Sequence, residues 1–204
     1  DSVLIDNNEI TTVDTNADLE LRTEETITQY VGELTANEPL TDTSLRNGKQ
    51  TIAVNDEYIV IGDPSSNENG FLEGRVMVYT RQGEYQYTLY EPGNESISLF
   101  GGSVSLNENN ILVAGAYNTP PSGRGSVVFY NVETQEQLLR VTGPTSSSNF
   151  GWTTAINNRY AFVSITGSSQ FDNVRVYDLY QDPPQLVQTL THPTSTDPFN
   201  SDSF

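Results

Sequence analysis

The chain has 204 residues and carries 27 acidic against 9 basic side chains, so its formal net charge is -18. A surface this negative repels phosphate backbones and anionic lipid surfaces, and we therefore do not expect nucleic acid as a partner. Cysteine is absent, which excludes disulfides, thiolate nucleophiles and Cys-ligated zinc. No apolar run approaches the roughly 18 residues that a membrane-spanning helix requires, so no membrane insertion is expected.

The first 40 residues are predicted to form a short β segment for attachment or oligomerisation, followed by a connector. In residues 3–23, apolar and polar residues alternate around two Asn/Asp turns, which is typical of short strands. A hairpin of this size cannot bury enough apolar area to be stable alone, so other chains or the rest of the protein must complete it. Residues 24–44 contain at most a short helix and are interpreted as the connector.

Residues 41–204 contain a unit that repeats about every fifty residues. The sequence of residues 99–117 has a counterpart in residues 149–166 and a degenerate third copy in residues 47–64. Each copy leads into a second shared pattern, GRVMVYT, GSVVFYN or DNVRVYD, and then into a third that ends at a proline. The predicted units span about residues 45–97, 98–147 and 148–202, and residues 203–204 look like the start of a fourth.

Within a unit the apolar pattern predicts strands. In the second unit, Val104 and Leu106 share one face of a first strand, residues 107–110 form a tight turn, and residues 111–114 form a strand buried on both faces. Two further strands are predicted at residues 127–130 and 138–141. Four short antiparallel strands with this period describe a blade, so the predicted fold is an all-β, partial β-propeller.

Three registered copies of one motif also point to a family. Phe100-Gly101, the Val-x-Leu strand after it, and the run Val113-Ala114-Gly115-Ala116 resemble the FG-GAP repeat of integrin α-subunit propellers and of bacterial and phage surface proteins. The pair recurs at Phe150-Gly151, whereas the first unit lacks the Phe and Ser164 departs from the Gly-Ala ending. The amino-terminal strands, with Ile10, Asp18, Leu19 and Leu21, resemble a motif of marine tailed-phage fibre and virion proteins, which implies assembly between chains, commonly as trimers.

Calcium loops occur in many FG-GAP repeats, but the corresponding turns of this chain are too short to surround a cation with six or more oxygens. The resemblance is therefore to the calcium-free branch, and no cofactor is expected. Asn67, Asn69 and Glu73 imitate the spacing of an oxygen-ligand loop and form the one weak metal candidate. A simple turn is the alternative interpretation.

Ligand binding is predicted on the loops that join the second and third strands of each unit, residues 63–73, 116–124 and 165–172. Their aromatic, amide and arginine side chains suit saccharide or protein surfaces, because a ring can stack on an apolar face while polar groups bind hydroxyls. The candidate ligand-binding residues are Phe71, Tyr117, Arg124, Gln170 and Phe171. Packing within their own loops is the alternative, and Trp152 is expected to pack in the core between sheets.

Catalysis has little support in the sequence. The one histidine is His192, and the sequence has no G-x-S-x-G motif whose serine it could activate as a general base. No spacing singles out a pair of carboxylates for glycoside hydrolysis. We therefore expect a non-enzymatic virion structural or tail-fibre-like protein of a tailed phage, which binds host-surface glycan or protein and assembles with its own copies or other virion proteins. A secreted or cell-surface bacterial adhesion propeller is the alternative, and a glycan-acting enzyme on a propeller scaffold is a second one.

Overall fold

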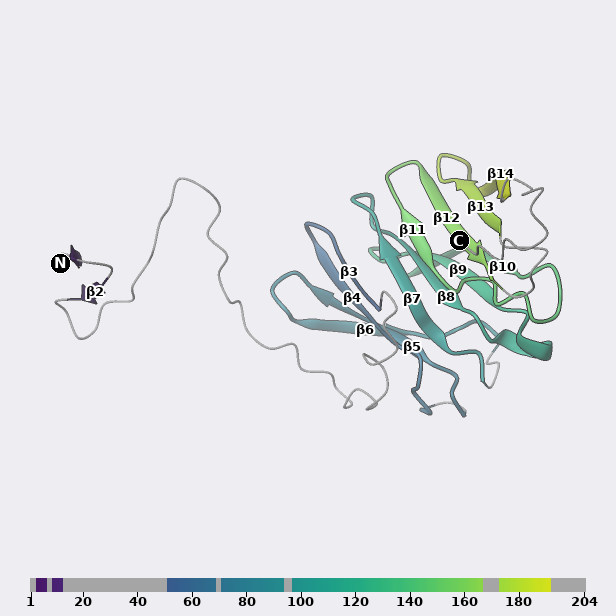
Figure 1. Cartoon of the computed structure of the whole chain (residues 1–204), viewed down its shortest axis with the longest axis horizontal. Helices are drawn as coiled ribbons and strands as arrows, with labels where there is room; N and C mark the ends of the chain where they lie inside the picture. The colour runs from purple at the N-terminus through teal and green to yellow at the C-terminus, as the bar shows by residue number, and fades with distance from the viewer. Residues whose placement is uncertain are drawn as a thin grey trace, which may run out of the picture. The chain divides into compact units, whose positions relative to one another are not determined.

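The computed structural model describes residues 3–6, 9–12, 51–68, 71–93, 97–166 and 173–191, with side chains from residue 51 onward. The chain divides into two compact units, Asp1–Gly32 and Glu33–Phe204 (Figure 1). In the first unit, β1 (Val3–Asp6) pairs with β2 (Glu9–Thr12) in an antiparallel hairpin. Two of the predicted amino-terminal strands are thus present, while residues 13–23 and the predicted connector lie outside the described residues.

The second unit contains three four-stranded antiparallel sheets, each built from strands that follow one another in the chain. The first sheet consists of β3 (Ile52–Val54), β4 (Tyr58–Asp63), β5 (Arg75–Thr80) and β6 (Tyr85–Leu89). The second consists of β7 (Phe100–Leu106), β8 (Ile111–Ala116), β9 (Ser126–Asn131) and β10 (Glu136–Thr142). The third consists of β11 (Thr154–Ile156), β12 (Tyr160–Ile165), β13 (Asn173–Asp178) and β14 (Gln185–Thr191). A short helical turn, η1 (Thr119–Gly123), interrupts the loop after β8.

The all-β prediction is therefore confirmed. The strands expected in the second repeat, residues 98–147, lie within β7 to β10. None of the described sheets closes on itself. Strand β8 is buried along nearly its whole length, as expected for a strand covered on both faces.

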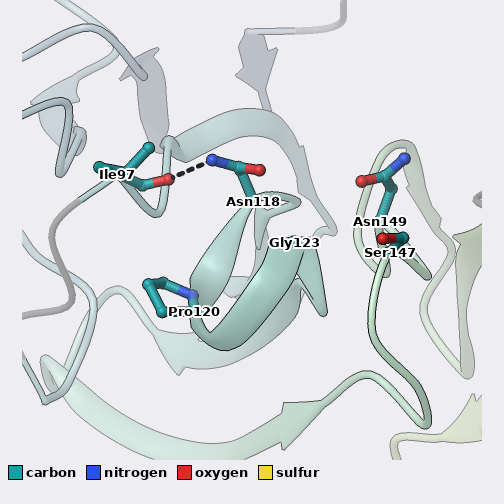
Figure 2. A pocket seen from close by; sticks show the side chains of 6 residues that line it. All are labelled: Ile97, Asn118, Pro120, Gly123, Ser147 and Asn149. Atoms are coloured by element: carbon teal, nitrogen blue, oxygen red, sulfur yellow. Dashed lines mark hydrogen bonds between the residues drawn. The ribbon is translucent and has the colours of Figure 1, made fainter.

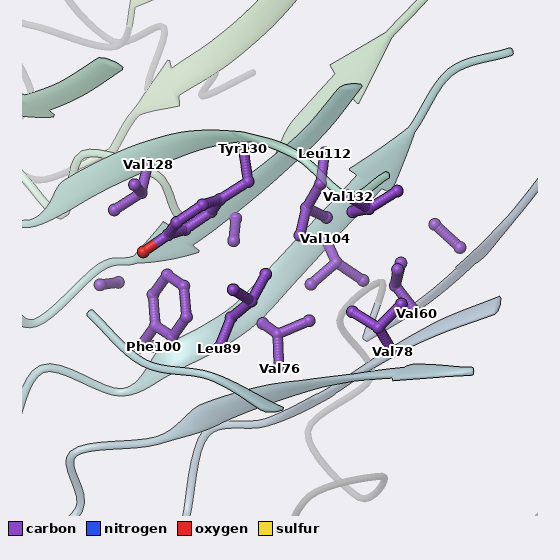
Figure 3. Close-up of a cluster of buried hydrophobic side chains, with 13 residues drawn as sticks. Val60, Val76, Val78, Leu89, Phe100, Val104, Leu112, Val128, Tyr130 and Val132 are labelled. Carbon is purple, nitrogen blue, oxygen red and sulfur yellow. The ribbon is translucent and has the colours of Figure 1, made fainter. Parts of the chain in front are cut away.

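Apolar side chains fill the space between successive sheets. Val60 and Val78 of the first sheet pack with Val104 and Leu112 of the second, and all four are fully buried (Figure 3). A second cluster joins the second sheet to the third and contains Phe129 and Val163 among others. Most of the described core of this unit thus lies between sheets, because each sheet has an apolar face that its neighbour covers. A smaller buried cluster, Ile61, Met77 and Tyr79, lies on the other face of the first sheet.

The Phe-Gly pair sits at each of these two junctions. Phe100 and Phe150 are fully buried and form parallel bridges to Gly74 and Gly125 of the preceding sheet. The glycine after each Phe has φ above 80°. A Cβ on Gly115 would lie 2.1 Å from the carbonyl oxygen of Gly151, so the close approach of the two sheets requires glycine there.

A ladder of asparagines links the hairpins between the first and second strands of the three sheets. Asn55, Asn107 and Asn157 each accept two backbone N–H groups of their own turn through Oδ1. The Nδ2 of Asn55 donates to the carbonyl oxygen of Asn107 at 2.8 Å, and the Nδ2 of Asn107 donates to that of Asn157 at 3.1 Å. The same side chain therefore closes a turn and joins one sheet to the next.

Candidate functional site

An open pocket lies at the end of the sheets that carries the connections between second and third strands. In an antiparallel meander successive connections alternate between the two ends, so the connections from one sheet to the next lie at this end as well. We call it the loop end. The pocket has a volume of about 590 Å³ and is lined by Ile97, Asn118, Pro120, Gly123, Ser147 and Asn149 (Figure 2).

Two asparagine side chains aim their oxygens at one point of this pocket. Nδ2 of Asn118 donates to the carbonyl oxygen of Ile97 at 2.8 Å, and Nδ2 of Asn149 donates to that of Thr166 at 3.0 Å. These bonds determine which end of each amide is oxygen. A Cβ on Gly123 would lie 3.3 Å from Oδ1 of Asn118 and 3.6 Å from Oδ1 of Asn149. The two acceptors thus converge over a residue that has no side chain.

The backbone around the pocket repeats an unusual conformation. Ile97 and Ser147, which are fifty positions apart, have φ of 68° and 58°, and Gly123 between them has φ of 65°. For the β-branched Ile97 this conformation is strained, since the left-handed region places its Cβ close to the backbone. Its side chain is nevertheless 42% exposed, so burial of that side chain does not offset the strain.

An aromatic pair stands beside the pocket. The rings of Tyr117 and Trp152 meet edge to face with centroids 4.8 Å apart, and burial raises the pKa of Tyr117 above its usual value. The Tyr117 ring lies on Gly102, where a Cβ would be 2.6 Å from Cε1. The prediction that Trp152 packs in the core was wrong: its side chain is 37% exposed, because Gly151 turns the chain outward just before it.

A buried polar cluster anchors η1 under the pocket. The Glu91 carboxylate is fully buried, pairs with Nη2 of Arg140 at 2.8 Å and accepts hydrogen bonds from Thr119 and Ser126. Burial, with the nearby Glu91 charge, raises the pKa of Tyr130 to about 12, so its hydroxyl remains protonated at neutral pH and donates to the carbonyl oxygen of Tyr90 at 2.9 Å. Glu91 follows β6, the last strand of the first sheet, and it contacts the loop between β8 and β9. It therefore holds this loop of the second sheet in place.

The predicted ligand-binding residues differ in position and exposure. Phe71 is 66% exposed at the loop end, and its carbonyl oxygen accepts the N–H of Ile97 at 2.7 Å. Tyr117 belongs to the aromatic pair, and Arg124 follows the pocket residue Gly123 with its Nε buried and unpartnered among the described residues. Gln170 and Phe171 lie outside the described residues.

The weak metal candidate is only partly described. Asn67 uses its Oδ1 to accept the N–H of Leu72 at 2.7 Å, which closes the loop as a turn residue would. Glu73 is buried, and Asn69 lies outside the described residues. Within the described part of the chain no group of three His, Cys, Asp or Glu side chains could hold a metal ion.

The sequence analysis missed Asn118, Ser147 and Asn149. Ser147 and Asn149 precede Phe150 in the connection between sheets, a region that the strand pattern leaves unassigned. Their signal was the repeat itself, since they occupy the same positions as Ile97 and Leu99 before Phe100. All four residues have positive φ, so the two connections share this local conformation just before the Phe.

No protein-family model matches the chain, and no curated protein is significantly similar to it. Among the described residues there is no helix long and apolar enough to cross a membrane. The site is therefore interpreted from its own geometry.

Proposed function

We propose that the three sheets are consecutive blades of a β-propeller of the FG-GAP type. Two repeated contacts support this arrangement. Strand β7 lies against β3, β4 and β5 of the first sheet, and β11 lies against β7 and β8 of the second. The bridges Gly74 to Phe100 and Gly125 to Phe150 occur at matching positions of both junctions. The same contact between neighbouring sheets, repeated around an axis, is the principle of a propeller.

The proposed activity is non-enzymatic binding of a saccharide in the pocket at the loop end. The observation that carries it is the convergence of two amide oxygens over Gly123, next to the Tyr117–Trp152 pair, of which Tyr117 is half-buried and Trp152 is exposed. Sugar hydroxyls donate hydrogen bonds to such oxygens, while the apolar face of a pyranose stacks on an aromatic ring. Among the described residues that line the pocket none is charged, which suits a neutral ligand.

The setting proposed for this binding module is a virion surface or a tail fibre, with a host-surface glycan as the ligand. The support is the resemblance of residues 3–23 to phage fibre strands, joined in one chain to the repeats. A secreted or cell-surface bacterial adhesion protein would use the same pocket in the same way.

A glycan array followed by calorimetric titration tests the proposal. The purified chain should retain a subset of neutral glycans. Gly123→Ala should weaken binding of these by about tenfold or more, because the added methyl group, at 3.3 Å from Oδ1 of Asn118, occupies the point of convergence. Trp152→Ala should weaken binding by about fivefold, since one stacking contact contributes about 1 kcal/mol.

Two matched variants separate binding from folding. Gly83 also has positive φ, at 89°, but lies in the turn between β5 and β6 at the opposite end, so Gly83→Ala carries comparable backbone strain away from the pocket. Tyr180 is a 68% exposed aromatic residue at that same end and serves as the control for Trp152. If these controls weaken binding as much as the pocket variants do, or if no glycan is retained, the proposed site is wrong.

A further inference from the structure

The end of the sheets opposite the loop end, which we call the turn end, has a pocket of its own. It lies between the second and third sheets and has a volume of about 210 Å³. The start of β8 and the residues around the turn from β9 to β10 form one wall, and the turn from β13 to β14 forms the other. The second sheet contributes Ile111, Glu136 and Leu138 to the lining, and the third contributes Leu179, Asp182 and Pro184.

At the junction of the first and second sheets, two tyrosines fill the corresponding space. Tyr58 and Tyr87 pack against a buried cluster that contains Val132 of the second sheet. The hydroxyl of Tyr87 donates to the carbonyl oxygen of Val132. Burial raises the pKa of Tyr87, so this hydroxyl remains a donor at neutral pH. At this junction the protein itself therefore places phenol rings between two sheets.

At the junction of the second and third sheets, both tyrosines have aliphatic counterparts. Ile111 begins β8 as Tyr58 begins β4, and each lies opposite the last residue of the third strand. Leu139 has the register in β10 that Tyr87 has in β6. The third sheet again has a tyrosine, Tyr160, at the start of its second strand. The pocket is thus space that aromatic rings fill in the first sheet and that smaller side chains leave open here.

The turn of residues 179–184 supplies an acceptor for a phenol hydroxyl. Leu179 occupies the place of Val132, since the N–H of each donates to the residue before the second strand, at 2.8 and 2.9 Å. The carbonyl oxygen of Val132 accepts the Tyr87 hydroxyl, whereas that of Leu179 accepts no hydrogen bond from a described residue. This turn is also longer than residues 132–135, and its Pro184 is buried against the pocket.

The rim of the pocket is acidic. Glu136 and Asp182 are exposed, and neither forms an ion pair with a described residue. Among the described residues that line the pocket none is basic. Carboxylates beside an apolar pocket attract a positive group, and the net charge of -18 strengthens this attraction at low salt.

We propose that this pocket binds a small arylalkylamine, a single phenol ring that carries an ammonium group on a short chain. The ring fills the space that Ile111 leaves open, and its hydroxyl donates to the carbonyl oxygen of Leu179 as Tyr87 donates to that of Val132. The ammonium group lies between Glu136 and the turn of residues 179–184. The site is at the opposite end of the sheets from the proposed glycan pocket and does not depend on it.

Three probes test the ring and the charge separately in ligand-observed NMR titrations. Tyramine should bind the purified chain with a dissociation constant of about 1 mM or tighter. Hexylamine, which has the charge without the ring, should bind at least about tenfold more weakly. The compound 3-(4-hydroxyphenyl)propionate has the ring with a carboxylate, and repulsion by the acidic rim should weaken its binding by at least about the same factor.

Ile111→Tyr fills the pocket with a side chain that the other two sheets already have at this position. It should weaken tyramine binding by at least about tenfold, because the new ring occupies the site of the ligand. Ile52→Tyr makes the same change at a position of the first sheet that is 50% exposed, and it should leave binding unchanged. Circular dichroism of both variants checks that they fold.

A second pair of variants tests the rim without touching the core. Glu136→Gln should weaken tyramine binding by about threefold, since it removes one of two rim charges. Glu133→Gln removes an exposed charge of the same turn that does not line the pocket, and it should have no effect. Absence of tyramine binding, equal binding of hexylamine, or full binding by Ile111→Tyr would overturn the proposal. Tyramine binding by a chain that retains no glycan would refute the proposed function alone.

Discussion

At the scale of single residues, Asn107 combines two interactions in one amide. Its Oδ1 accepts the N–H groups of Asn109 and Ile111, and its Nδ2 reaches the carbonyl oxygen of Asn157 in the next sheet. Asn107→Asp keeps the acceptor and removes the donor, and it also brings a negative charge to a carbonyl oxygen in a buried position. We expect a loss of about 1–3 kcal/mol in the free energy of unfolding, measured by urea denaturation.

Asn131 supplies the matched control for this prediction. Its Oδ1 accepts the N–H groups of Glu133 and Thr134 in an exposed turn of the second sheet, without a described bond to another sheet. Asn131→Asp should change the unfolding free energy by less than about 0.5 kcal/mol. Equal losses in the two variants would mean that turn closure, and not the link between sheets, is the contribution of Asn107.

At the scale of elements, the spacing of β8 from the next sheet depends on a single missing side chain. Gly115→Ala would place a Cβ 2.1 Å from the carbonyl oxygen of Gly151 and 2.4 Å from Oγ of Ser103. Because backbone atoms cannot rotate away as a flexible side chain can, the two sheets must separate. We expect a destabilisation of about 3 kcal/mol or more, measured as a shift of the denaturation midpoint.

The equivalent position of the third sheet tests the same argument from the other side. Ser164 already carries a Cβ, and Ser164→Ala should cost less than about 1 kcal/mol. Comparable losses at Gly115 and Ser164 would show that local strand propensity, and not contact between sheets, governs these positions.

At the scale of the whole molecule, the net charge of -18 acts against compactness. Like charges repel one another more strongly in a folded chain than in an extended one, and salt screens this repulsion. The melting temperature should therefore rise by several degrees between about 0.01 M and about 0.5 M NaCl, followed by circular dichroism. Choline chloride should produce the same shift, because screening does not depend on the identity of the cation. A shift with NaCl alone would indicate a bound cation instead.

Much of the architecture could be predicted from local patterns. The alternating apolar residues, together with Asn and Gly at the turns, predict the repeat of about fifty residues. They also predict the strands of the second repeat, residues 98–147, and the turn at residues 107–110. The loop end could be predicted too, since Phe71, Tyr117 and Arg124 all lie there. These features depend on neighbours in the sequence, or on a period that the sequence displays directly.

The strands, their order and the end at which the long loops gather follow from the amino-acid sequence, because strand and turn preferences act over a few residues. The convergence of the Asn118 and Asn149 oxygens over Gly123, and the exposure of Trp152 beside Tyr117, become visible only once the sheets have packed. It also showed that Gly115 leaves room for the next sheet while Ser164 fills that space. Such relations depend on how closely one sheet approaches another, and this distance is set by side chains about fifty residues apart that meet only after the sheets have packed.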